Sequence, residues 1–240
     1  MGKAVLIVVG IALVLAGIGV LLMPHSDQKQ SYITITFDDG YVSQYKAAEQ
    51  LENYGWKGVF YFPSGLAGKE FEGIPVMSWE QIEDLHARGH EIGGHTATHA
   101  RASNYTKTDW EAEVRDGKLL LAQHGIETES FAYPNNDARY ADVAKKYFTS
   151  QRNVQGGINE IGATEIYGLA LTHDNYKEVL PEYLGDLKSG GGWLVLVIHN
   201  IDENPRPDID LAPEEYAWVL ENIKDSGIPV KLVSEVLKSG

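Results

Sequence analysis

Five side chains that can carry chemistry follow segments whose hydrophobic pattern is typical of β-strands. They are Asp38, Asp39, His95, His99 and His199. In α/β proteins the carboxyl ends of parallel strands meet at one face, and that face holds the catalytic groups. We therefore expect these aspartates and histidines to converge on one site.

His95 and His99 are separated by three residues. If those residues form a helical turn, both imidazoles lie on one side and can bind the same cation. The carboxylate of Asp39 would complete a set of three ligands, and the lack of cysteine excludes thiolate ligands. Three protein ligands leave one position open for water or substrate, so the set is typical of a hydrolytic metal centre.

Asp38 and His199 suggest a division of labour around such a metal. With Asp39 on the ion, Asp38 can take a proton from the attacking water, and His199 can give one to the leaving group. Taken singly, each feature also fits an ordinary structure: a tight turn, a solvated helix or a structural histidine. Their placement after different strands favours a catalytic site.

Strands and helices alternate along residues 31–240. The pattern predicts strands near residues 33–37, 59–62, 91–94, 130–133, 167–172, 193–198 and 230–233, and helices over 41–54, 78–89, 108–123 and 213–225. Thr108 with Glu111 reads as the capping box of the third helix. The alternation indicates an α/β fold with a mainly parallel sheet covered by helices, either a barrel or an open doubly wound sheet.

The amino-terminal residues 4–23 contain no charged side chain. About 20 apolar residues in helical conformation span a bilayer, so we expect a transmembrane helix over residues 1–23, a linker over 24–31 and a catalytic domain over 32–240. The charge of Lys3 before this segment favours a membrane-anchored domain outside the cytoplasm, at the cell surface. A cleaved signal peptide, which would give a secreted protein, is the alternative.

The charge balance bears on the partners of the protein. Twenty Lys and Arg residues against 34 Asp and Glu residues give a formal net charge of −14. Proteins that bind nucleic acid neutralise phosphates with basic surfaces, so we expect no nucleic-acid partner. A hydrophobic content of 43% with 22% charged residues indicates a folded globular domain.

Three segments resemble the motifs of one enzyme family. Residues 36–40 read Thr-Phe-Asp-Asp-Gly, residues 89–99 read Gly-His-Glu-Ile-Gly-Gly-His-Thr-Ala-Thr-His, and residues 196–199 read Leu-Val-Ile-His. In order and spacing they resemble the polysaccharide deacetylases, carbohydrate esterases that include chitin, chitooligosaccharide and peptidoglycan N-acetylglucosamine deacetylases. The resemblance runs from about residue 32 to residue 236.

The resemblance implies a distorted (β/α) barrel that holds one divalent metal ion, zinc in most members and cobalt or nickel in some. Asp39, His95 and His99 would be its ligands. Asp38 would be the general base and His199 the general acid. The implied reaction removes N-acetyl groups from an N-acetylglucosamine-type glycan and yields acetate and a free amine.

The third motif of the family corresponds to the segment after the strand at 130–133. Here Pro134 and Asn135 would contact the substrate, with the backbone N–H of Asn135 as an oxyanion donor. The sequence departs from the family at Ala132, where many members carry an arginine that orients the catalytic aspartate. It departs again at Asn135-Asn136, where Tyr-Gly is common. Asp174 is a candidate for the fourth motif, which would tune His199.

Two other functions remain open on the sequence. One is a metal-dependent amide hydrolase, a deacetylase or deformylase, that acts on a lipid-linked or small sugar conjugate, since a membrane anchor would lie close to the domain. The other is a glycan-binding protein without turnover. The presence of both Asp38 and His199 argues against the second, because a binder needs neither a base nor an acid.

Overall fold

The computed structural model describes residues 29–104 and 106–240. The predicted transmembrane helix over residues 1–23 and most of the predicted linker lie outside these residues. In the described part of the chain, no helix is both long enough and apolar enough to cross a bilayer.

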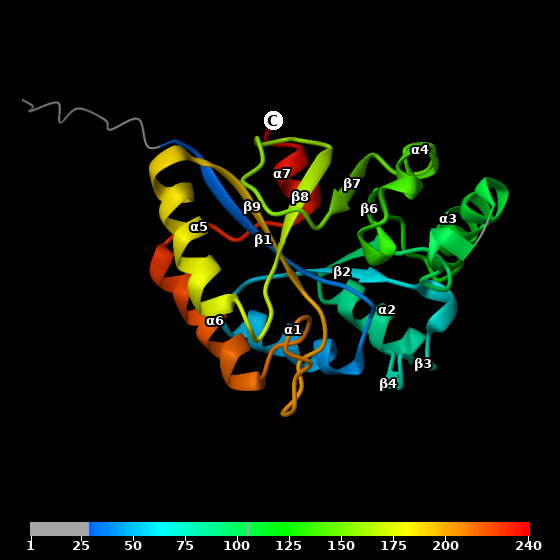
Figure 1. Cartoon of the computed structure of the whole chain (residues 1–240), viewed down its shortest axis with the longest axis horizontal. Coiled ribbons are helices and arrows are strands. Elements are labelled where there is room, and N and C mark those ends of the chain that lie inside the picture. The colour runs from blue at the N-terminus through cyan, green and yellow to red at the C-terminus, as the bar shows by residue number, and fades with distance from the viewer. Residues whose placement is uncertain (1–28, 105) are drawn as a thin grey trace, which may run out of the picture.

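Seven parallel strands close into a barrel in the order β1-β2-β5-β6-β7-β8-β9 (Figure 1). They are β1 (Ser31–Phe37), β2 (Val59–Phe62), β5 (Glu91–Gly94), β6 (Ser130–Ala132), β7 (Ser150–Asn153), β8 (Glu165–Ala170) and β9 (Gly192–Ile198). Closure comes from β1 and β9, which pair along their whole length from Ser31 opposite Gly192 to Phe37 opposite Ile198. Of the two architectures that the alternation allowed, the chain therefore adopts the barrel.

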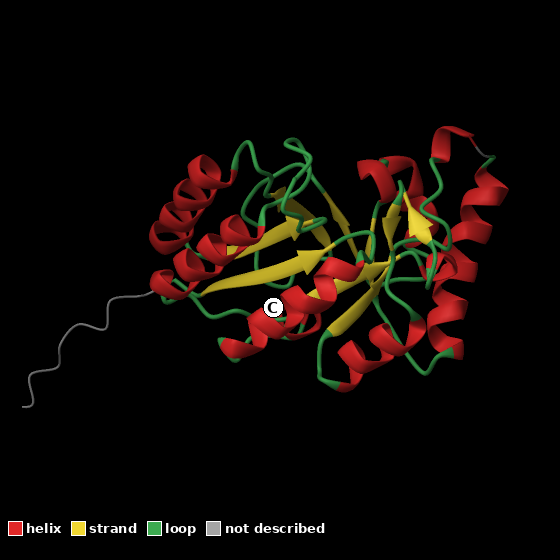
Figure 2. Cartoon of the chain, turned by 90° about the horizontal axis from the view of Figure 1, so that it is seen from below, coloured by secondary structure: helices red, strands yellow, loops and turns green. Residues whose placement is uncertain are grey.

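Helices surround the barrel, and α7 lies across one of its ends (Figures 1 and 2). They are α1 (Val42–Asn53), α2 (Trp79–Ala87), α3 (Lys107–Gln123), α4 (Ala141–Ala144), α5 (Tyr176–Gly190), α6 (Pro213–Ser226) and α7 (Val233–Leu237). A two-stranded hairpin, β3 (Glu70–Phe71) and β4 (Ile74–Pro75), follows β2. Helices α5 and α6 pack together on one flank, and α3 packs with α4 on the opposite flank (Figure 1).

Alternate residues of the strands face the outer helices and the barrel interior. The inward cluster consists of Val59, Tyr61, Ala132, Ile166, Trp193, Val195, Val233 and Val236. The last two belong to α7, and the backbone N–H of Ser234 in the same helix donates to the side chain of Glu91 at the start of β5 (2.9 Å). Helix α7 therefore closes the end of the barrel from which the strands start.

The structure departs from two of the predictions and contains elements that were not predicted. The strand expected at 230–233 is absent: Val230 makes a single bridge to Ile33, and α7 begins at Val233. The capping box of α3 is formed by Thr106 with Asp109, not by Thr108 with Glu111. Strand β7 and helix α5 were not predicted, because β7 reads Ser-Gln-Arg-Asn and α5 contains an internal proline.

A buried histidine couples the stability of this fold to pH. The backbone N–H of Gly58 donates to Nδ1 of His90 (3.0 Å), so the ring is neutral in the folded chain. Burial lowers the pKa of His90 to about 4, whereas an unfolded chain has a histidine pKa near ~6.5. The unfolded state therefore takes up a proton first, and this contribution to the free energy of unfolding, present above pH ~6.5, is lost as the pH falls through about 4.

We expect His90→Asn to flatten this pH dependence, because an amide oxygen can accept the Gly58 N–H but does not titrate. The wild type should lose about 3 kcal/mol more than the variant between pH 7 and pH 4. Urea unfolding at several pH values measures the difference. If the free energy of unfolding depended on pH equally in both proteins, His90 would not be the cause of the loss of stability in acid.

Candidate metal centre

Asp39, His95 and His99 come together at the end of the barrel where the strands finish. Oδ1 of Asp39 lies 3.3 Å from Nε2 of His95 and 3.1 Å from Nε2 of His99. Within residues 29–104 and 106–240, this is the one group of three or more carboxylate and histidine side chains placed to hold a metal ion, and its donor atoms lie within 4.8 Å of one another. The predicted ligand set is thus assembled by the fold.

The backbone that presents these ligands is strained. His95 and His99 are joined by an irregular turn instead of the helical turn expected from their spacing. Asp39, Thr96 and His99 all have positive φ angles, of 71°, 64° and 57°. Non-glycine residues in this conformation cost free energy and cluster at functional sites, where the surrounding structure holds them in place. Here the Thr96 hydroxyl accepts the His99 N–H (3.0 Å) and fixes the turn.

Each imidazole is oriented by a neighbour outside the ligand set. Nδ1 of His95 lies 2.8 Å from the carbonyl oxygen of Ala132. A carbonyl can only accept, so Nδ1 carries the proton and Nε2 presents its lone pair toward Asp39. The ring of His99 packs against Phe71 of β3, with centroids 4.5 Å apart. Strand β6 and the β3–β4 hairpin therefore aim the two rings.

The Asp39 carboxylate is ionised in this setting. Burial alone would raise the pKa of Asp39, but the contacts with His95 and His99 and the nearby His199 outweigh burial and lower the pKa well below its usual value. The group therefore offers a charged oxygen at neutral pH, as a metal ligand must.

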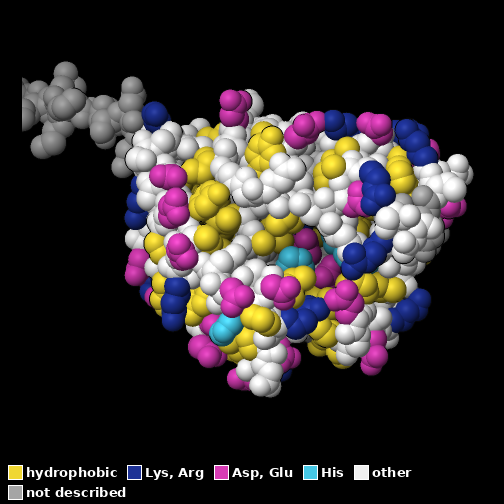
Figure 3. Space-filling view, in the orientation of Figure 1, with side chains coloured by type: hydrophobic (Ala, Val, Ile, Leu, Met, Phe, Trp, Pro, Cys, Tyr) yellow, Lys and Arg dark blue, Asp and Glu magenta, His cyan; other side chains and the backbone are white. Residues whose placement is uncertain are grey.

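Asp38 and His199, the predicted base and acid, lie beside the ligands. Oδ2 of Asp38 is 3.9 Å from Nε2 of His199, and Oδ1 forms an ion pair with Arg152 of β7. Asp38 is only 3% exposed, whereas the His199 side chain is 15% exposed and so reaches solvent. Figure 3 shows a histidine and acidic side chains together in a depression of the molecular surface.

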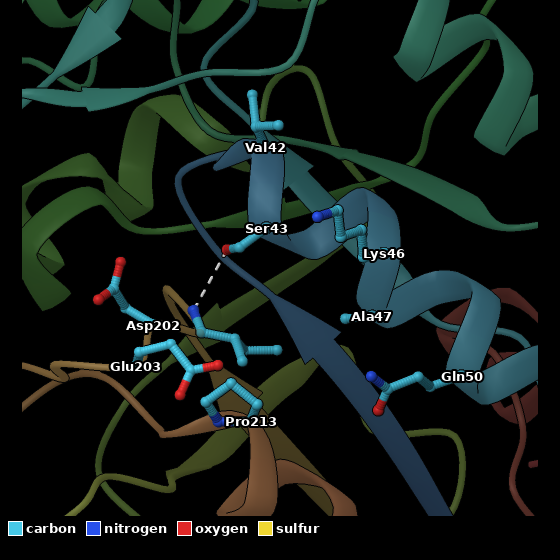
Figure 4. A pocket seen from close by; sticks show the side chains of 9 residues that line it. Val42, Ser43, Lys46, Ala47, Gln50, Asp202, Glu203 and Pro213 are labelled. Carbon is cyan, nitrogen blue, oxygen red and sulfur yellow. Dashed lines mark hydrogen bonds between the residues drawn. The ribbon is translucent and has the colours of Figure 1, made fainter.

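The first turn of α1 ties the two catalytic segments together. The buried amide of Gln44 donates to the carbonyl oxygens of both Asp38 and His199. The Ser43 hydroxyl donates to the side chain of Asn200 (2.7 Å) and accepts the N–H of Ile201 (3.2 Å; Figure 4). A pocket of about 460 Å³ lies between α1 and the segment after His199 (Figure 4). Gln44 and Ser43 were missed by sequence analysis, because nothing in a helix pattern marks such contacts.

The turn that carries Pro134 and Asn135 follows β6 directly. Asn135 and Asn136 both have positive φ angles, 54° and 53°, which asparagine tolerates better than most residues. The Asn136 side chain accepts the N–H of Val154 (2.7 Å) and donates to its carbonyl oxygen (3.1 Å). The Asn136 side chain thus holds this turn to the residue that follows β7.

The candidate for the fourth motif does not contact the predicted acid. The side chain of Asp174 is exposed, and its backbone N–H bonds to Pro207. In the part of the chain that the structure describes, no hydrogen bond reaches the buried Nδ1 of His199. The tuning role considered for Asp174 therefore has no contact to support it.

The family model described as polysaccharide deacetylase matches residues 25–150, more than half of the 240 residues. The chain belongs to the polysaccharide deacetylase family. Among curated relatives in this family, the peptidoglycan-N-acetylglucosamine deacetylase of Bacillus cereus is 30% identical over 114 residues, which are 45% of this chain and 50% of that protein. The polysaccharide deacetylase YxkH of Bacillus subtilis is 31% identical over 103 residues, 42% of this chain and 36% of that protein. The chain therefore spans half or less of these relatives.

Two solved structures share the fold over most of the chain. The Bc1960 peptidoglycan N-acetylglucosamine deacetylase aligns with a TM-score of 0.58 at 14% identity and covers 88% of this chain and 90% of its own. A family 4 acetyl xylan esterase from Clostridium thermocellum, solved with a cobalt ion, aligns with a TM-score of 0.57 at 17% identity and covers 87% and 91%. These likenesses establish the barrel.

The donor set of this chain fits a divalent ion. Oδ1 of Asp39 is buried and has no conventional hydrogen-bond partner among the described residues, although two imidazole nitrogens face it. A carboxylate oxygen and two imidazole nitrogens are donors that suit zinc and cobalt.

Proposed function

We propose that the protein is a metal-dependent hydrolase that removes acetyl groups from an N-acetylated, N-acetylglucosamine-type glycan and releases acetate and a free amine. The observation that carries this proposal is the pairing of an Asp-His-His donor set with a second aspartate and a partly exposed histidine at one end of the barrel. Zinc is the proposed ion, with cobalt or nickel as substitutes.

Asp39, His95 and His99 would hold the ion, which supplies Lewis-acid polarisation of the acetamide carbonyl and of the attacking water. Oδ1 of Asp38 is engaged by Arg152, so Oδ2 is the oxygen available to accept a proton from water. His199 lies on the Oδ2 side of Asp38 and reaches solvent, where it can hold the proton that the leaving amine needs. The Asn135 N–H is proposed as the second oxyanion contact.

The test is acetate release by the purified chain, stripped of metal and reloaded with zinc or cobalt, from N-acetylglucosamine oligomers. Metal-dependent release supports the proposal. Activity confined to a lipid-linked or single-sugar amide would mean that the substrate is a small conjugate and not a glycan. Stoichiometric metal binding without turnover of any amide would leave a glycan-binding role.

We also propose that residues 1–23 anchor the domain to a membrane, with the barrel outside the cytoplasm. Support comes from the uncharged run 4–23, which has the length of a bilayer-spanning helix. Sedimentation of the full chain with membranes, and release of a chain that lacks residues 1–23, is the expected outcome. A full chain found only in the soluble fraction would contradict the anchor.

A further inference from the structure

The interior of the barrel contains a buried arginine directly beside Asp38. Arg152 of β7 is 0% exposed, and one of its terminal nitrogens, Nη2, donates to Oδ1 of Asp38. Among the described residues, Asp38 is the one carboxylate in salt-bridge range of Arg152. The other two guanidinium nitrogens of Arg152, Nε and Nη1, have no hydrogen-bond partner among these residues. A buried cation with unpaired N–H groups destabilises the folded state. The contact with Asp38, its one carboxylate partner among the described residues, therefore indicates the role of Arg152.

The neighbouring strands leave space for this side chain. A Cβ atom on Gly168 of β8 would lie 2.7 Å from Cδ of Arg152 and 2.6 Å from Cγ2 of Val197, so a larger residue there would clash with the arginine stem and its neighbour. The ring of Tyr61 on β2 lies 5.0 Å from the guanidinium carbon, a cation–π contact. Small residues and an aromatic face from separate strands therefore surround the stem and head of Arg152.

The strand on the other side of Arg152 carries Ala132. The two residues are register partners, Ala132 on β6 opposite Arg152 on β7. Register partners on adjacent strands point to the same side of a sheet, so an arginine at position 132 would enter the space that Arg152 fills. The small side chain of Ala132 on β6 thus leaves the space that the long side chain of Arg152 on β7 occupies.

We propose that Arg152 is the positioning residue that sets the orientation of Asp38 for amide hydrolysis, an inference that rests on the proposed function. By engaging Oδ1, it leaves Oδ2 on the side of His199, 3.9 Å away. Arg152 does not touch the substrate or the ion. Its effect belongs to the chemical step, because a small displacement of a catalytic group is enough to cost about 10²-fold in rate.

The test compares Arg152→Met and Arg152→Lys with Arg139→Met, which removes an exposed arginine paired to Asp137. For both Arg152 variants we expect kcat to fall by about 10²-fold, with KM and cobalt affinity within about twofold of the wild type. The control should keep the wild-type kcat. A kcat within about twofold of wild type in folded Arg152→Met would overturn the proposal.

A relocation variant separates positioning from folding. Arg152→Ala removes the cation, and the double variant Ala132→Arg/Arg152→Ala returns it from the neighbouring strand. Recovery of at least about tenfold of the lost kcat is expected in the double variant, and no recovery despite a folded, metal-binding protein would count against positioning. Crystal structures of wild type and Arg152→Lys add a readout that does not depend on turnover: the Asp38 carboxylate should rotate. A wild type that hydrolyses no amide would refute the proposed function, whereas an unrotated Asp38 would refute the role of Arg152.

Discussion

Replacing Asp38 with asparagine should lower kcat for acetate release by about 10²–10⁴-fold, the range that a general base contributes. The amide cannot accept a proton from water at neutral pH. Its oxygen can still accept the hydrogen bond from Arg152, but the neutral amide no longer offsets the buried charge of the guanidinium, so the variant should be less stable than the wild type and is assayed below its unfolding temperature. Steady-state kinetics with the zinc-loaded protein measure the loss.

Metal binding supplies the internal check on this variant. Asp38 is not one of the three donors that lie together, so Asp38→Asn should still bind one ion per chain with an affinity close to that of the wild type. Asp174→Asn makes the same chemical change at an exposed carboxylate and should leave kcat unchanged. If Asp38→Asn kept half of the wild-type kcat, the base would have to be another group.

Replacing His95 with glutamine should abolish stoichiometric metal binding together with turnover. The variant removes one of three protein ligands and leaves the carbonyl of Ala132 without its imidazole partner. Changes outside a ligand set already weaken metal affinity by about 10–100-fold, so loss of a ligand should exceed about 100-fold. Competition with a chromophoric chelator measures the affinity.

The matched control for this variant is His124→Gln. His124 is a more exposed histidine that pairs with Glu83, stacks on Trp79 and is not one of the three donors. It should bind zinc and release acetate as the wild type does. Unaltered cobalt affinity in His95→Gln would mean that the ion binds elsewhere, and the assignment of the centre would fail.

The site was predictable because its residues fall in contiguous motifs at strand ends. Asp38 and Asp39 follow a strand with alternating hydrophobic residues, and His199 follows a continuous apolar strand. The hydrophobic pattern therefore predicts that all three residues lie at strand ends. Their convergence required only the rule that parallel strands end at one face. The turn from His95 to His99 was expected as helical, and the strained backbone that replaces it leaves no trace in residue spacing.

Arg152 could not be found in this way. Its strand reads Ser-Gln-Arg-Asn, which shows neither alternation nor an apolar run, and an arginine in such a segment reads as exposed. Its burial depends on the register with Ala132 and on the gap at Gly168, which are contacts between separate strands. The departure at Ala132 was visible in the sequence, but Arg152, which occupies the space beside it, lies twenty positions later.

The error at residues 230–233 has a physical cause. Residues 230–233 alternate like a strand, yet the apolar side chains that follow, Val233 and Val236, face the barrel interior from a helix. Short apolar runs at the end of a chain fit either element, and tertiary packing decides between them. The choice between barrel and open sheet also depended on tertiary pairing, that of β1 with β9.

The pairing of β1 with β9 also determines when the domain can fold during its synthesis. Thr36 on β1 donates to the backbone of Leu196, 160 residues later. At ~5–20 residues per second a ribosome needs on the order of 10–30 s to make that interval, and α7 emerges later still. Until then the first strand has a partner on one side only, so the nascent chain stays open for most of its translation, and contacts so distant in sequence make the closing step slow as well.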